Sequence, residues 1–171
     1  MTPTISYQIN RFLRGSIPFW LSLFLIMLSV VPIRIPGFAI VTPSLLMISV
    51  FYWSLHRPYL LPAPVVFLLG LIFDILTGTP LGLSSFLLLL VHGVALTQRQ
   101  VFVGRAFILS WWGFLLIGIG IAILSWLFTS LLSLTFVPMV PVLTQLGLTV
   151  LVFPLLAWCF YMIQSSVLRH I

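Results

Sequence analysis

One carboxylate stands out among the side chains of this sequence that could do chemistry. Asp74 is the single acidic residue, and the basic residues are seven arginines with no lysine. Asp74 lies near the end of an apolar run and is followed closely by Thr77, Gly78, Thr79 and Pro80. A carboxylate in or near hydrocarbon costs several kcal/mol unless it is paired or reaches water. The retention of this one acid therefore indicates that Asp74 has a specific task.

Three roles are open for Asp74. It could accept hydrogen bonds from the Thr77 or Thr79 hydroxyl and so fix the turn that follows. It could face a partner or a water-filled lumen, or it could take part in proton or substrate chemistry. Arg57 is 17 residues away, or roughly 25 Å along a helix, and cannot pair with it. We expect Arg34 to supply the counter-charge, beneath the outward-facing surface of the membrane that the protein spans.

The other candidate groups favour packing over catalysis. His92 lies inside an apolar segment, and a proton relay would need a second titratable group at similar depth. None is evident, so we expect a hydrogen-bonded packing histidine. The single cysteine, Cys159, excludes an internal disulfide and a cysteine-based metal site. No phosphate loop, paired carboxylates or metal cluster is present, so the sequence predicts a protein that is not an enzyme and has no cofactor.

The composition indicates which elements must position these residues. The chain has 171 residues, of which 62% are hydrophobic and 5% charged, and its mean hydropathy is +1.32. A soluble domain of this size could not bury so much apolar surface. A transmembrane helix needs about 20 mostly apolar residues, so the chain has room for roughly six. We therefore predict an all-α polytopic membrane protein, with residues 1–171 forming a single integral-membrane domain.

Prolines, glycines and arginines divide the chain into six expected spans after a short cytoplasmic tail of residues 1–16. Pro43 is expected in the first turn of the second span. Thr79 and Pro80 suit the cap and the first position of the fourth, and Pro154 is expected to kink the last. The expected spans are about 17–33, 39–55, 62–77, 80–97, 106–131 and 141–165.

The arginines predict the orientation, because loops on the cytoplasmic side of a membrane carry an excess of positive charge. With the N-terminus inside, only Arg34 lies outside. The cytoplasmic arginines are then Arg11, Arg14, Arg57, Arg99, Arg105 and Arg169. Six spans with both termini in the cytoplasm satisfy this pattern, and they place Asp74 near the outer end of the third span.

A family resemblance covers residues 43–82. The residues that carry it are Tyr52-Trp53-Ser54-Leu55-His56-Arg57-Pro58, then Pro62, then Gly70-Leu71, Asp74-Ile75-Leu76, Gly78 and Pro80-Leu81-Gly82. This pattern resembles the MreD family of bacterial rod shape-determining membrane proteins, and the length, the spans and Pro154 also fit. The family is similar in turn to the six-helix substrate-binding subunits of energy-coupling-factor transporters.

The resemblance implies a non-enzymatic scaffold of the cell-elongation complex in the bacterial cytoplasmic (inner) membrane, needed for rod shape and side-wall peptidoglycan synthesis. The implied partners are the bitopic protein MreC, and also RodA, a class B penicillin-binding protein and MreB filaments. The alternative is a small-molecule-binding subunit of a membrane transporter. We expect an outer hairpin held in shape by Gly70, Asp74, Gly78, Pro80 and Gly82. An inner loop is expected to be shaped by Arg57, Pro58 and Pro62, and Arg34 is the expected counter-charge of Asp74.

Overall fold

The structure is a computed structural model that describes residues 16–30, 42–102, 107–134 and 138–167. Within these ranges the chain forms α-helices and one short 3-10 turn, and no strand. The elements are α2 (Ile17–Val30), α3 (Leu45–His56), η1 (Pro58–Leu60), α4 (Ala63–Thr77), α5 (Leu83–Phe102), α6 (Phe107–Ser133) and α7 (Met139–Val167). The expected all-helical class is confirmed.

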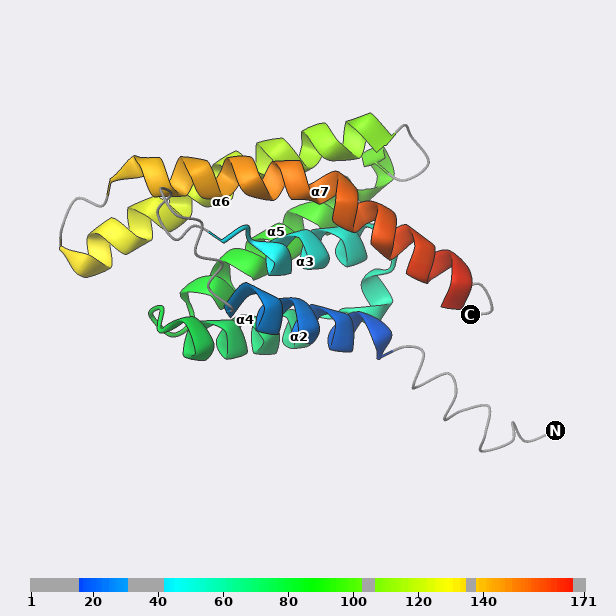
Figure 1. Cartoon of the computed structure of the whole chain (residues 1–171), viewed down its shortest axis with the longest axis horizontal. Coiled ribbons are helices and arrows are strands. Elements are labelled where there is room, and N and C mark those ends of the chain that lie inside the picture. Colours follow the sequence, from blue (N-terminus) through cyan, green and yellow to red (C-terminus); the bar gives the residue numbers. More distant parts are fainter. Residues whose placement is uncertain (1–15, 31–41, 103–106, 135–137, 168–171) are drawn as a thin grey trace.

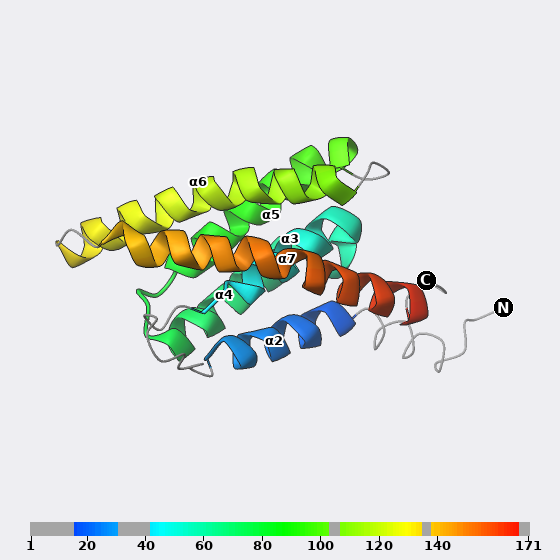
Figure 2. The same cartoon turned by 45° about the horizontal axis from the view of Figure 1, so that its top comes forward.

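Consecutive helices run in alternate directions and form a layered bundle (Figure 1). Helices α6 and α7 lie side by side on one face, α2 and α4 lie on the opposite face, and α3 and α5 lie between them (Figures 1 and 2). The start of α2 and the end of α7 lie at one end of the bundle. The α4–α5 connection lies at the other end, which we call the hairpin end.

Helix α3 is the centre of the core. Eleven of its twelve residues are buried, and it contacts α2, α5 and α7. The Phe51 ring packs against those of Phe114 and Phe153, at centroid distances of 5.2 and 5.9 Å, and Phe114 stacks on Phe153 at 4.4 Å. Aromatic pairs at such distances add to the burial of apolar area, and they tie α3 to the α6–α7 pair.

Two predicted spans begin at the wrong residue. The second was expected from residue 39 with Pro43 in its first turn, but α3 begins at Leu45. Pro43 lies before the helix, and its carbonyl accepts the Leu45 N–H at 2.9 Å. The fourth was expected over 80–97 with Thr79 as its cap, whereas α5 covers Leu83–Phe102. The predicted bounds of the other helices agree with the described residues to within three positions.

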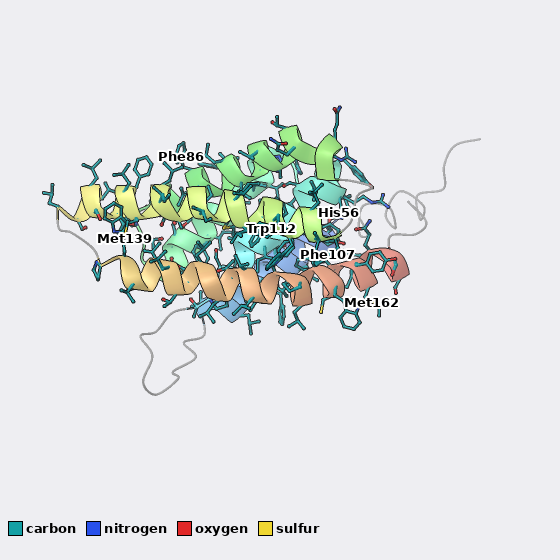
Figure 3. All side chains as sticks on the ribbon, turned by 90° about the horizontal axis from the view of Figure 1, so that it is seen from above. His56, Phe86, Phe107, Trp112, Met139 and Met162 are labelled. Atoms are coloured by element: carbon teal, nitrogen blue, oxygen red, sulfur yellow. The ribbon has the colours of Figure 1, made fainter. Side chains whose placement is uncertain are left out.

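Helix length supports a membrane for part of the bundle. Phe107–Ser133 and Met139–Ser166 are long and apolar enough to cross one, with mean hydropathies of 2.3 and 2.2. Side chains stand out along the outer faces of α6 and α7 (Figure 3), and Leu116 and Leu151 are 67% and 72% exposed. Apolar faces of this extent indicate contact with lipid or protein. Helices α2, α3 and α4 are shorter, with 14, 12 and 15 residues, so helix length does not establish six spans.

Candidate functional site

The α4–α5 hairpin brings together most of the residues that the sequence singled out. Helix α4 ends at Thr77, and Gly78 follows with φ +70°, in the left-handed region. Gly82, just before α5, has φ +93°. Side chains with a Cβ rarely adopt these angles, whereas glycine does so at little steric cost. The two glycines therefore allow the chain to leave α4 and enter α5 within five residues.

Asp74 is fully buried beneath this turn and joins its parts. Its Oδ1 accepts the Thr79 hydroxyl at 2.8 Å and the Ser84 N–H at 3.2 Å, and its Oδ2 accepts the Gly82 N–H at 2.8 Å. Both oxygens therefore act as hydrogen-bond acceptors. Hydrogen bonds to a carboxylate are stronger than those between neutral groups. Asp74 therefore makes the main side-chain contribution to holding the hairpin together.

The same bonds make Asp74 the N-terminal cap of α5. The first N–H groups of a helix have no partner within the helix, and negative charge at this end is favourable. Ser84 is the second residue of α5, so its N–H is one of these groups. Thr79 was predicted to cap this helix, but its hydroxyl donates to Asp74 instead. A cap usually comes from the residue next to the helix, and this one is supplied from the preceding helix.

The turn-fixing role is therefore the one of the three that the geometry supports. Of the two expected hydroxyl partners, Thr79 bonds Asp74 directly. The Thr77 hydroxyl donates to the Phe73 carbonyl at 2.7 Å and lies 3.1 Å from the Thr79 hydroxyl. Arg34, the expected counter-charge, lies outside the described residues.

Gly70 brings the two helices of the hairpin into close contact. A Cβ at this position would lie 2.4 Å from the Ser85 Cα and 2.7 Å from the Ser85 nitrogen. Glycine is the residue that lets helix backbones approach this closely. Ser85 is fully buried, and its hydroxyl donates to the Phe67 carbonyl at 3.1 Å. Gly70 thus locks α4 against α5 one turn below Asp74.

The tip of the hairpin carries an exposed apolar side chain. Leu81, between Pro80 and Gly82, is 72% exposed. The Pro80 carbonyl accepts the Leu83 N–H at 3.1 Å, and the Gly82 carbonyl accepts the Phe86 N–H at 2.9 Å, so the backbone on both sides of Leu81 is held. A fixed and exposed leucine is suited to contact another surface.

The loop between α3 and α4 lies at the opposite end of the bundle from the hairpin (Figure 1). Pro58 begins the short turn η1, and the Pro62 carbonyl accepts the Val65 and Val66 N–H groups at the start of α4. The Arg57 guanidinium donates to the Tyr59 hydroxyl and lies 5.8 Å from the centre of its ring. These residues lie where the chain passes from α3 into α4.

Sequence reasoning missed one contact at this end of the bundle, made by Arg99 of α5. The Arg99 Nε donates to the Leu55 carbonyl at 3.1 Å, from near the end of α5 to the last turn of α3. The last carbonyls of a helix lack partners within it, and a cation there is favourable. The residues are 44 positions apart, so no local pattern in the sequence indicates the contact.

His92 is a hydrogen-bonded packing residue, as predicted. Its Nδ1 lies 2.6 Å from the Ser54 hydroxyl, and both side chains are buried, with exposures of 5% and 0%. The bond joins the two central helices, α3 and α5. A buried polar group is costly when its partner is removed, whereas replacing both partners by apolar groups can be nearly neutral.

This asymmetry gives a prediction for the pair. We expect Ser54→Ala to lower the free energy of unfolding by about 1–2 kcal/mol, because the imidazole keeps its burial and loses its partner. The double variant Ser54→Ala/His92→Leu is expected to recover at least half of that loss. Thermal unfolding in detergent measures both effects. Losses that simply add in the double variant would contradict the assignment.

Comparison with known proteins is consistent with these features. The sequence model of the family described as "rod shape-determining protein MreD" matches residues 9–144, which is well over half of the chain and includes the whole hairpin. No curated protein and no solved structure gives a match.

Proposed function

Because this chain belongs to the MreD family of rod shape-determining proteins, we propose that it acts as a non-enzymatic membrane scaffold of the cell-elongation complex. In this proposal the protein lies in the bacterial inner membrane with its helices crossing in alternate directions. It contributes to side-wall peptidoglycan synthesis by holding other proteins in place. The role in rod shape is that of the family, and the scaffold mechanism is our proposal.

The hairpin is the observation that supports a scaffold. Its single carboxylate holds the turn and caps a helix through the bonds to Thr79, Gly82 and Ser84. These three hydrogen bonds hold the hairpin in shape, which favours a structural role for Asp74 over a chemical one. A rigid turn loses little conformational freedom when a partner binds, and preorganisation of this kind increases affinity.

We propose that the hairpin tip contacts MreC, a bitopic membrane protein. Leu81 supplies an exposed apolar side chain, and Pro80 and Gly82 fix its position. A partner segment that packs on this tip would gain apolar contact with a surface that is already ordered. RodA, the class B penicillin-binding protein and MreB would then join the complex directly or through MreC.

The test is co-purification of MreC with a Gly78→Leu variant from mild detergent. Leucine at φ +70° is strained, so we expect the turn to rearrange and move Leu81. MreC recovery should fall at least fivefold, while the variant remains in the membrane fraction. Cells that depend on the variant should lose their rod shape.

Gly120→Leu is the matched control. Gly120 is exposed on α6, and a Cβ there would meet nothing within 4 Å, so the same substitution adds the same bulk away from the hairpin. We expect normal MreC recovery and normal rods from this variant. Undiminished recovery of MreC with Gly78→Leu would show that the hairpin is not the contact.

A further inference from the structure

A cavity of about 210 Å³, partly open to the outside, lies between the helices at the hairpin end. Four helices line it, namely α3, α5, α6 and α7, and Thr79 of the hairpin and Phe73 of α4 complete the wall. Neighbouring helices around this ring contact one another: α3 with α5, α5 with α6, α6 with α7, and α7 with α3. The cavity is therefore a feature of the tertiary packing and not a gap between separate parts.

The cavity lies near the start of α3, which is much shorter than α6. Helix α3 has 12 residues and α6 has 27, which correspond to about 18 and 40 Å. The phenylalanines of α6 and α7 pack on α3 at Phe51. Helix α3 starts at Leu45, at the hairpin end. Ser44, just before the helix, and Met47, in its first turn, line the cavity. Among the described residues, the cavity therefore lies beside the first turn of α3.

The lining changes character along the bundle. Hydroxyl groups gather toward the hairpin end, from Thr79, Ser84, Ser125 and Thr129. The most deeply buried lining side chains are apolar: Leu46 of α3 and Leu88 and Val91 of α5 are at most 5% exposed. None of the described residues that line the cavity is charged. The polar groups of Ser44 and Thr149 are partly satisfied by each other, since the Ser44 N–H donates to the Thr149 hydroxyl at 2.9 Å.

We propose that this cavity holds the hydrocarbon chain of a membrane lipid, with the ester or hydroxyl oxygens of the lipid at the hydroxyl rim. A cavity with apolar walls gives water few hydrogen-bond partners, and such cavities bind apolar molecules instead. The absence of charge among the lining residues fits an uncharged part of the lipid. The proposal rests on the proposed membrane location, because the bilayer is the source of the chain.

The test uses purified full-length protein reconstituted with a phospholipid that carries a photoactivatable diazirine on one acyl chain. Leu87, Leu88 and Val91 are 8%, 5% and 0% exposed, so lipid on the outside of the bundle cannot reach them. We expect crosslinks at these residues by mass spectrometry, beside crosslinks on exposed positions such as Leu116 and Leu151.

Two substitutions on adjacent residues of α6 separate the cavity from the outer surface. Ala122 lines the cavity, and Ala122→Phe should fill it and reduce the interior crosslinks at least tenfold. Ile123 is 55% exposed, and Ile123→Phe should leave them unchanged. Ser125→Leu, a smaller change in the same wall, should reduce them at least threefold and serves if the phenylalanine variant fails to fold.

Each outcome decides a different point. Exterior crosslinks without interior ones in the unsubstituted protein would overturn the lipid cavity and leave the membrane location intact. Interior crosslinks that persist in the wall variants would also overturn it. An absence of crosslinks at both kinds of position would overturn the membrane location and the cavity together.

Discussion

Asp74→Ala is expected to reduce the free energy of unfolding by about 3 kcal/mol, because three bonds to one carboxylate disappear and the Gly82 and Ser84 N–H groups lose their acceptor. For a chain of this size the change corresponds to a fall of roughly 10 °C in melting temperature. Thermal unfolding of the detergent-solubilised protein measures it. The effect should be concentrated in the hairpin, where hydrogen exchange of the α5 N-terminus should accelerate.

Asp74→Asn refines this prediction. The amide oxygen can still accept one set of donors, whereas the amide NH₂ would face an N–H or hydroxyl donor. We expect the free energy of unfolding of Asp74→Asn to lie between those of the unsubstituted protein and Asp74→Ala. Thr97→Val is the control on α5, because the Thr97 hydroxyl donates to the Gly93 carbonyl on an exposed surface. If the melting temperature of Asp74→Ala lies within about 2 °C of that of the unsubstituted protein, Asp74 does not stabilise the hairpin as proposed.

Gly70→Ala and Gly93→Ala are expected to change stability in opposite directions. At Gly70 the new Cβ would lie 2.4 Å from a backbone atom of Ser85, so α4 and α5 must separate, at a cost of about 3 kcal/mol. At Gly93 a Cβ would meet nothing within 4 Å. Alanine is a better helix former than glycine by roughly 0.5–1 kcal/mol, so the second variant should be slightly stabilised.

Thermal unfolding of the two alanine variants side by side tests the close approach of α4 and α5. The chemical change is the same, and both glycines lie inside helices of the same hairpin. Equal melting temperatures for the two variants would be incompatible with the close contact. Cells that carry Gly70→Ala should also show weakened rod shape, since the proposed scaffold depends on the fixed hairpin.

Two helices begin later than the sequence predicted, each for its own reason. Local rules placed the start of the fourth helix at Pro80 with Thr79 as its cap. The helix begins three residues later, because Asp74, from the preceding helix, takes the Gly82 and Ser84 N–H groups. The second helix was expected from residue 39, where apolar residues continue the run. An apolar run does not show where a helix begins, and α3 starts after Pro43 at Leu45.

Asp74 itself illustrates what could be foreseen. The cost of a lone carboxylate in an apolar chain marked it as important, and the neighbouring Thr79 indicated one of its bonds. Its backbone partners lie eight and ten residues away, beyond the range of capping patterns. The contacts of Arg99 with Leu55 and of His92 with Ser54 are 44 and 38 residues apart in the sequence. Only helix packing brings such groups together.

The sequence by itself determined the helical class, the number of helices in the described chain and the place of the turn after Asp74. These depend on composition, on the length of apolar runs and on glycines and prolines, which act over a few residues. The tertiary structure decided the partners of Asp74, the close contact at Gly70, the central place of α3 and the cavity at the hairpin end. Each of these depends on which surfaces of different helices meet, and the energy of such contacts is a property of pairs of residues that are distant along the chain.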